Sequence, residues 1–169
     1  WSSDVCSSDL IHYPKRLLSL TAANARFDVP GPVKQAWNDR IAVVEKGGAA
    51  NAIAAATVAR WFEKTYPARE PARTARIQAM FDRVSVQGYV GCAKAIRDLD
   101  YRAALAKIDV PVLLISGRQD TSATEDMVNT MHSMIRGSKL VMLEPAGHLT
   151  VVEQPRAFGD AMEEFLPKA

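Results

Sequence analysis

The chain has 169 residues, enough for one domain with a substantial core, and its 48% hydrophobic and 24% charged residues are ordinary for a globular protein. The net charge is only +2 and no basic cluster accompanies it, so nothing suggests a nucleic-acid partner. No apolar run approaches the ~20 residues of a membrane span, and two cysteines are too few for a disulfide framework. These features favour a cytoplasmic protein without a membrane partner.

The first nine residues form a segment of their own. "WSSDVCSSD" repeats Ser-Ser-Asp, shows neither helical nor strand periodicity and lacks the basic region that begins a signal peptide. It resembles the translated sequencing adapter found at the ends of some assembled reads. We therefore expect residues 1–9 to be non-native, and we expect the native protein to extend further upstream.

Residues 10–32 are expected to form a core strand and a loop. The strand is predicted for the apolar run "LLSLTA", Leu17–Ala22, and the loop for "ARFDVPGPV", which contains two prolines and a glycine. Residues 33–98 show a helical pattern almost throughout, with apolar side chains at helical spacing such as Trp37 and Ile41. Three polar or Gly/Pro-rich breaks divide this block into four short helices. We predict that it is a helical insert, or lid.

Residues 99–169 have a different sequence pattern, which predicts strands that alternate with helices. "VPVLLISG", Val110–Gly117, is a continuous apolar run that predicts a strand buried on both faces. Ser122 and Glu125 have the spacing of a capping box at a helix start, "SKLVMLEP" predicts another strand, and Pro155 suits the first turn of a final helix. Short connections in this order indicate parallel strands. The predicted fold is therefore α/β, with about three parallel strands, flanking helices and a helical insert.

Two chemically capable side chains follow predicted strands. Asp120 lies in the loop after "VPVLLISG", and His148 lies in the loop after "SKLVMLEP". Function in open parallel sheets collects at the carboxyl ends of strands, so these loops are expected to adjoin. A carboxylate that accepts the Nδ1 proton of an imidazole fixes its tautomer and stabilises the imidazolium that forms during catalysis. Each residue also has a simpler interpretation, since Asp120 could cap the next helix and His148 could be structural.

At these residues the chain resembles a known superfamily. "LISGRQDTSAT" followed by "LVMLEPAGHLTVVEQPRAF" resembles the C-terminal third of the α/β-hydrolases. "LTAANARF", "ARWFEKTYP" and "GYVGCAKAIRDLDYRAALAKIDVPVLLISG" are similar to segments of 3-oxoadipate enol-lactonases, and this resemblance covers nearly everything from Leu10 onward. One departure is "RQDTSAT", where that group tends to have a proline-bearing loop.

The resemblance implies a Ser-His-Asp hydrolase in which Asp120 is the acid and His148 the base. It implies a small-molecule ester or lactone substrate, no metal or organic cofactor, and a lid that covers the pocket. The substrate implied most specifically is a 3-oxoadipate enol-lactone. Such a lactone carries a carboxylate, so a cationic partner is expected; the candidates are Arg60 beside Trp61, and then Arg97. Arg60 could equally be a solvated helix residue, and Trp61 could pack the lid core. The sequence does not indicate an oligomeric state.

The nucleophile of this superfamily is not found in the sequence. The expected G-x-S-x-G elbow does not occur in the 169 residues, and Ser2, Ser3, Ser7 and Ser8 lack the flanking glycines that a tight elbow requires. We expect the serine upstream of the present chain, and we expect the chain as written to be inactive. The alternatives are a general carboxylesterase, a carbon–carbon bond hydrolase, or a hydrolase-fold binding module without catalysis.

Overall fold

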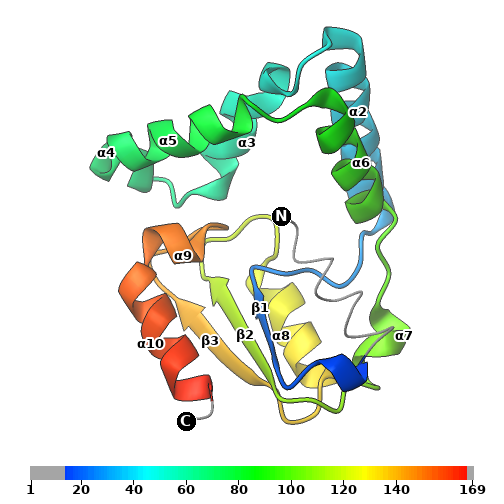
Figure 1. The fold of residues 1–169 in the computed structure, drawn as a ribbon, viewed down its shortest axis with the longest axis vertical. Coiled ribbons are helices and arrows are strands. Elements are labelled where there is room, and N and C mark those ends of the chain that lie inside the picture. Colours follow the sequence, from blue (N-terminus) through cyan, green and yellow to red (C-terminus); the bar gives the residue numbers. More distant parts are fainter. Residues whose placement is uncertain (1–13, 167–169) are drawn as a thin grey trace.

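The computed structural model describes residues 14–166, and the expected non-native segment at residues 1–9 lies outside this range. Within the described residues, three parallel strands form one sheet in the order β1-β2-β3: β1 at Leu20–Ala23, β2 at Val112–Gly117 and β3 at Lys139–Leu143. Figure 1 shows the sheet in the lower half of the molecule, with the helical block above it. The structure therefore has the predicted α/β fold.

The central strand explains why its sequence is so apolar. All six residues of β2 are buried, because β1 and β3 cover its edges and helices cover both of its faces. Leu114 pairs with Ala22 on one side and with Leu140 on the other. The first strand begins at Leu20 rather than at the predicted Leu17, because Leu20 is where pairing with β2 begins; Leu18 is 92% exposed.

Side chains alternate along β2 between two helices. Helix α8, Glu125–Met134, packs on the face of β2 that carries Val112 and Leu114. Ala22 of the neighbouring strand β1 belongs to the same hydrophobic layer. Helix α10, Pro155–Phe165, packs on the opposite face. Its contacts are made by Phe158, Met162 and Phe165 against Leu113, Ile115 and Leu143. Burying each large aliphatic side chain contributes about 1.5–3 kcal/mol, so these two layers hold the carboxyl ends of the strands in place.

The capping box predicted from Ser122 and Glu125 is wrong. Helix α8 begins at Glu125 with Thr124 as its N-cap, and no side chain caps it. The backbone N–H of Ser122 instead donates to Asp120 Oδ1 at 2.7 Å, and Glu125 pairs with Arg118 at 2.6 Å. The turn before α8 is thus organised around the Asp120 carboxylate.

The segment between β1 and β2 is helical, and it has a hydrophobic core of its own. The four helices expected there correspond to α2 (Gly31–Gly47), α3 (Ala54–Trp61), α5 (Pro71–Phe81) and α6 (Val86–Arg97), and the connections between them include two further short helices. Helices α2 and α6 lie side by side (Figure 1). The elements in chain order are α2 Gly31–Gly47, η2 Ala50–Ile53, α3 Ala54–Trp61, α4 Tyr66–Arg69, α5 Pro71–Phe81, α6 Val86–Arg97 and α7 Arg102–Leu105. Buried Val44, Val58 and Tyr66 belong to the core of this helical block, which we define as α2 to α6.

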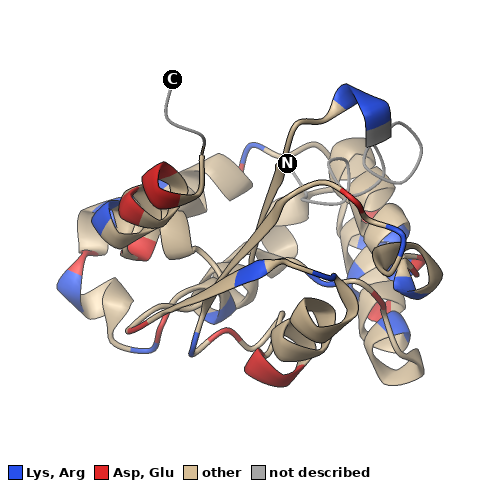
Figure 2. Ribbon diagram, turned by 90° about the horizontal axis from the view of Figure 1, so that it is seen from below, with Lys and Arg blue, Asp and Glu red and all other residues tan. Residues whose placement is uncertain are grey.

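Charged side chains are spread over the helices and loops. Figure 2 shows the strands nearly free of them; Lys139 at the start of β3 is the exception. Among residues 14–166, no helix has the length and apolar character needed to cross a membrane.

Candidate active site

The structure brings Asp120 and His148 into contact at the carboxyl ends of neighbouring strands. His148 lies between β3 and the short helix α9, Thr150–Glu153, and its Nδ1 lies 2.8 Å from Asp120 Oδ2. The Asp120 side chain is fully buried, whereas that of His148 is 27% exposed. Because the carboxylate occupies Nδ1, Nε2 is the imidazole nitrogen left to exchange a proton with a substrate or nucleophile.

Both oxygens of the Asp120 carboxylate are occupied by donors. Oδ1 accepts the backbone N–H groups of Ser122 at 2.7 Å and Ala123 at 3.1 Å. Oδ2 accepts Asn24 Nδ2 at 3.0 Å in addition to His148. Burial alone would raise the pKa of Asp120, but the hydrogen bonds from His148, Ser122 and Asn24 outweigh it and leave the pKa below its ordinary value. The acid therefore stays ionised at neutral pH. Asp120 organises the turn before α8 as well as the imidazole.

Two glycines allow the strand-end loops and the helical block to approach closely. A Cβ on Gly117 would lie 2.1 Å from the carbonyl oxygen of Gly147. A Cβ on Gly147 would lie 2.8 Å from the backbone nitrogen of Glu63. The loop between β3 and α9, residues 144–149, which we call the histidine loop, is therefore packed between β2 and the segment after α3, with no room for a side chain at either glycine.

The helical block is bonded directly to the histidine loop. The backbone N–H of His148 donates to the carbonyl of Trp61 at 2.7 Å. Buried Glu153 joins the same two segments, since Oε1 accepts the N–H of Glu63 at 2.7 Å and Oε2 accepts the N–H of Gly147 at 2.8 Å. Burial raises the pKa of Glu153, although these hydrogen bonds oppose the shift.

The other predicted site residues lie in the helical block, at differing distances from the pair. Trp61 contacts the histidine loop through its carbonyl, while its ring packs against Phe81 with centroids 5.4 Å apart. Arg97, at the end of α6, is held by Asp98 at 2.6 Å and donates to Asn38 at 3.1 Å. The structure thus brings the Trp61 backbone to His148 and leaves Arg97 in an ion pair.

Arg60 has a cationic neighbour that the sequence did not reveal. Burial of part of its side chain lowers the pKa of Arg60, and the nearby charge of Arg40 lowers it further. Arg40 itself lies over the Trp37 ring, 4.9 Å from the centroid. Burial raises the pKa of Tyr89, which faces both arginines. Among residues 14–166, neither Arg40 nor Arg60 forms an ion pair with an acidic side chain, so the cluster carries uncompensated positive charge.

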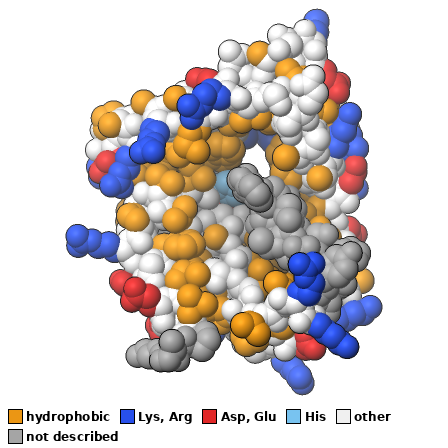
Figure 3. All heavy atoms as spheres, viewed as in Figure 1, with side chains coloured by type: hydrophobic (Ala, Val, Ile, Leu, Met, Phe, Trp, Pro, Cys, Tyr) orange, Lys and Arg blue, Asp and Glu red, His pale blue; other side chains and the backbone are white. Residues whose placement is uncertain are grey.

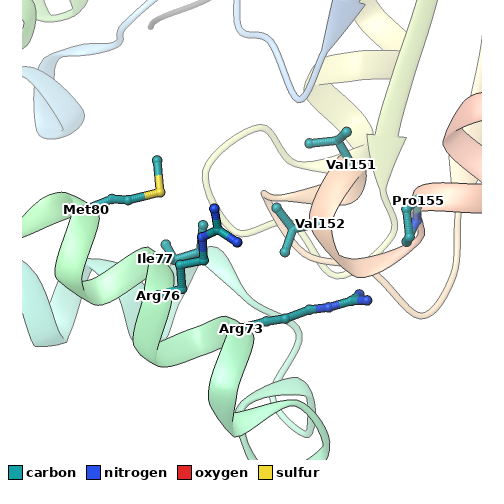
Figure 4. A pocket seen from close by; sticks show the side chains of 7 residues that line it. All are labelled: Arg73, Arg76, Ile77, Met80, Val151, Val152 and Pro155. Carbon is teal, nitrogen blue, oxygen red and sulfur yellow. The ribbon is translucent and has the colours of Figure 1, made fainter.

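A groove of about 430 Å³ lies between α5 and the residues that follow the histidine loop. Figure 4 shows Arg73 reaching from α5 toward Pro155, and Arg76 lying between Met80 and Val152. The remaining lining residues are Ile77 and Val151. Hydrophobic side chains also gather around the hollow between the helical block and the sheet (Figure 3). The face of the helical block turned toward the sheet therefore combines apolar surface with arginines.

Metal-binding residues do not gather in this part of the molecule. Within residues 14–166, no group of three or more His, Cys, Asp or Glu side chains lies close enough together to hold a metal ion.

Comparison with known proteins places the chain in a family. The family model described as the Ndr family matches residues 8–168. The chain belongs to the Ndr family. It is also 32% identical to 3-oxoadipate enol-lactonase 2 of Acinetobacter baylyi, over 94% of this chain and 58% of that protein, and 30% identical to enol-lactonase 1 of the same organism, over 92% and 57%. This Ndr-family chain thus spans less than two thirds of the length of these relatives.

Solved structures give the same fold for the Ndr-family chain. A hydrolase from Pseudomonas aeruginosa PA01 superposes with a TM-score of 0.88 and 34% identity, covering 95% of this chain and 60% of that one. The enol-lactonase from Burkholderia xenovorans LB400 superposes with a TM-score of 0.87 and 29% identity, over the same shares. The chain is therefore an α/β-hydrolase by fold, and it is similar to enol-lactonases over most of its length.

Three residues that surround Asp120 and His148 were not identified from the sequence: Asn24, Thr150 and Glu153. Asn24 directly follows β1, so the rule that located Asp120 and His148 at strand ends could have found it. Thr150 donates to Asn24 Oδ1 at 2.6 Å from the start of α9, and nothing in the sequence around it signals this bond. Glu153 precedes "QP" near a helix start, where a carboxylate is usually exposed, and its burial depends on the fold.

Proposed function

We propose that this protein hydrolyses an ester or lactone bond, with His148 as general base and Asp120 as the residue that orients it. The observation that carries the proposal is the 2.8 Å contact between His148 Nδ1 and the buried carboxylate of Asp120. Nε2 would accept the proton of a nucleophilic hydroxyl, and the adjacent carboxylate would stabilise the resulting imidazolium. The low pKa of Asp120 keeps that carboxylate charged while the proton moves.

The nucleophile in this proposal is a serine on a G-x-S-x-G elbow, supplied from outside these 169 residues. Its oxygen attacks the carbonyl carbon while His148 takes its proton. The tetrahedral intermediate then expels the enolate oxygen, to which His148 returns the proton. A water molecule, deprotonated by the same imidazole, hydrolyses the acyl-enzyme and releases the acid.

The proposed substrate is a carboxylate-bearing enol-lactone of the 3-oxoadipate type. Two curated relatives bear that activity in their names, at 32% and 30% identity. Arg60 stands next to Trp61, whose carbonyl bonds the histidine loop, and Arg40 adds a second uncompensated cation. We therefore assign the carboxylate of the substrate to Arg60, supported by Arg40. Arg97 remains a weaker candidate because Asp98 already neutralises it. The cysteine-poor composition supports a cytoplasmic enzyme.

A general carboxylesterase is the second candidate. A pimeloyl-[acyl-carrier protein] methyl ester esterase of Neisseria meningitidis is 37% identical over 67 residues, which is 40% of this chain. The acid and base would act in the same way on an uncharged ester, so the choice between the two activities depends on the lid and not on the catalytic pair. A binding module without catalysis would retain the fold and lack the serine.

The test begins with the native DNA upstream of Leu10, which should encode G-x-S-x-G; an elbow with another residue would favour the binding module. The restored enzyme should then hydrolyse the enol-lactone with a higher kcat/KM than a neutral aryl ester.

Arg60→Gln should lower kcat/KM for the lactone by about tenfold, the size of one lost hydrogen bond to a charged group, and leave the aryl ester unaffected. Arg136→Gln, at an exposed position beyond α8, is the matched control. Equal losses on both substrates in the Arg60 variant would contradict the assignment.

A further inference from the structure

Asn24 occupies a specialised position at the end of β1. Its backbone N–H donates to the carbonyl of Ile115 at 2.8 Å, which extends the pairing of β1 with β2 by one residue. Its φ of 51° lies in the left-handed region, which asparagine tolerates far better than most residues. This conformation ends the strand, and Asn24 as a whole residue is only 7% exposed.

The Asn24 amide links the acid, the histidine loop and helix α9. Nδ2 donates to Asp120 Oδ2 at 3.0 Å and to the carbonyl oxygen of Gly147 at 3.1 Å. Oδ1 accepts the hydroxyl of Thr150 at 2.6 Å. The two acceptors on one side and the hydroxyl donor on the other fix which end of the amide carries nitrogen. All the hydrogen-bonding groups of the side chain are therefore used in one orientation.

We propose that Asn24 is a positioning residue for the Asp120–His148 pair, and the inference rests on the function proposed above. Its amide and the His148 imidazole share one carboxylate oxygen, so Asn24 fixes the direction in which that oxygen accepts the imidazole proton. Its second bond holds the peptide group that joins Gly147 to His148, which sets the position of the ring.

Because this hydrogen-bond network is buried, the position of the Asp120 carboxylate depends on the Asn24 amide. Asp120 is 4% exposed and Asn24 is 7% exposed, so solvent does not readily replace a lost donor. Without the Asn24 amide, Oδ2 retains only the imidazole, and the Gly147 carbonyl loses its side-chain partner. The carboxylate would then be held chiefly through Oδ1, by Ser122 and Ala123, and could turn away from His148.

Asn24→Asp is the sharpest variant, because it keeps the shape and the tolerance of positive φ but replaces the donor with an oxygen. In the enzyme with its native upstream segment restored, we expect kcat to fall about tenfold to a hundredfold, the loss expected for a hydrogen bond to a charged group, with KM changed less than about twofold. The acid limb of the kcat–pH profile should move to higher pH, because a second carboxylate favours the protonated imidazole.

Asn129→Ala, which removes an exposed asparagine of α8, is the matched control and should leave kcat and the pH profile unchanged. Thr150→Val keeps the Asn24 amide but removes the donor that orients it, so it should shift both readouts in the same direction by a smaller amount. A kcat and pH profile in Asn24→Asp equal to those of the unchanged protein would overturn the proposal.

A measurement without turnover separates this inference from the proposed function. Proton NMR should show a deshielded Nδ1 proton of His148 in the unchanged protein, and this resonance should shift or broaden in Asn24→Asp but not in Asn129→Ala. If the unchanged protein hydrolyses no ester or lactone, the proposed function fails, while the resonance still decides whether Asn24 positions the pair. An identical resonance in Asn24→Asp would refute the positioning role.

Discussion

At the scale of single residues, the site depends on one ionised carboxylate whose two oxygens are both occupied by hydrogen-bond donors. Burial disfavours the charge of Asp120, whereas the hydrogen bonds from His148, Ser122 and Asn24 favour it. The geometry of the Asp120–His148 contact and the stability of the fold are therefore coupled at this position. Ser122 and Ala123 hold Asp120 within its own turn, while Asn24 and His148 connect it to the residues after β1 and β3.

That coupling predicts how stability depends on pH. Because the pKa of Asp120 is lower in the folded state, the folded protein binds fewer protons than the unfolded chain, and the carboxylate stabilises the fold above the unfolded pKa of about 3.9. This stabilisation should be lost as the pH falls through the folded pKa. Thermal unfolding of the protein and of Asp120→Asn over this acidic range should show a smaller loss of Tm with acid in the variant. Parallel curves would contradict the role of Asp120.

At the scale of elements, the histidine loop packs closely against the segment after α3. Gly147 has backbone atoms of Trp61, Phe62 and Glu63 within 2.9 Å of where its Cβ would be. Bonds from His148 to the Trp61 carbonyl and from the Glu63 N–H to Glu153 close the same contact. The helical block is thus fixed to the loop that carries His148.

Gly147→Ala tests this contact directly. The added methyl group meets backbone atoms that cannot move independently, so we expect the free energy of unfolding to fall by about 1–3 kcal/mol. The matched control is Gly159→Ala in α10, where a Cβ would meet nothing within 4 Å and where alanine should stabilise the helix by about 0.5–1 kcal/mol. Denaturant unfolding of both variants measures the difference. Equal effects of the two substitutions would show that the loop and the helical block are not in firm contact.

The elements also show what the sequence could predict. The continuous apolar run of β2 has few alternatives to a buried strand, and the carboxyl ends of adjacent parallel strands must meet, so the contact of Asp120 with His148 was predictable. The capping box at Ser122 failed because a nearer acceptor, the carboxylate of Asp120 two residues earlier, takes the same N–H group. Burial of Glu153 depends on how the helical block sits on the sheet, and the cluster of Arg40 with Arg60 depends on packing within that block; local patterns encode neither.

At the scale of the whole molecule, the described part of the chain combines a sheet at whose end Asp120 and His148 meet with a helical block that carries cations and apolar surface. The Ndr-family model matches residues 8–168, and the chain spans 58% of the length of one enol-lactonase relative. In the described residues, β1 has β2 as its one strand neighbour. The proposed nucleophile and the rest of the pocket would be completed by sequence beyond these 169 residues.

The most direct test of the central claim is a double-mutant cycle on hydrolysis of the enol-lactone by the restored enzyme. Because the two residues act as one unit, we expect His148→Ala and Asp120→Asn each to lower kcat by about 10⁴-fold, and the double variant to be little worse than either. Effects that multiply, or substantial turnover in His148→Ala, would contradict the account.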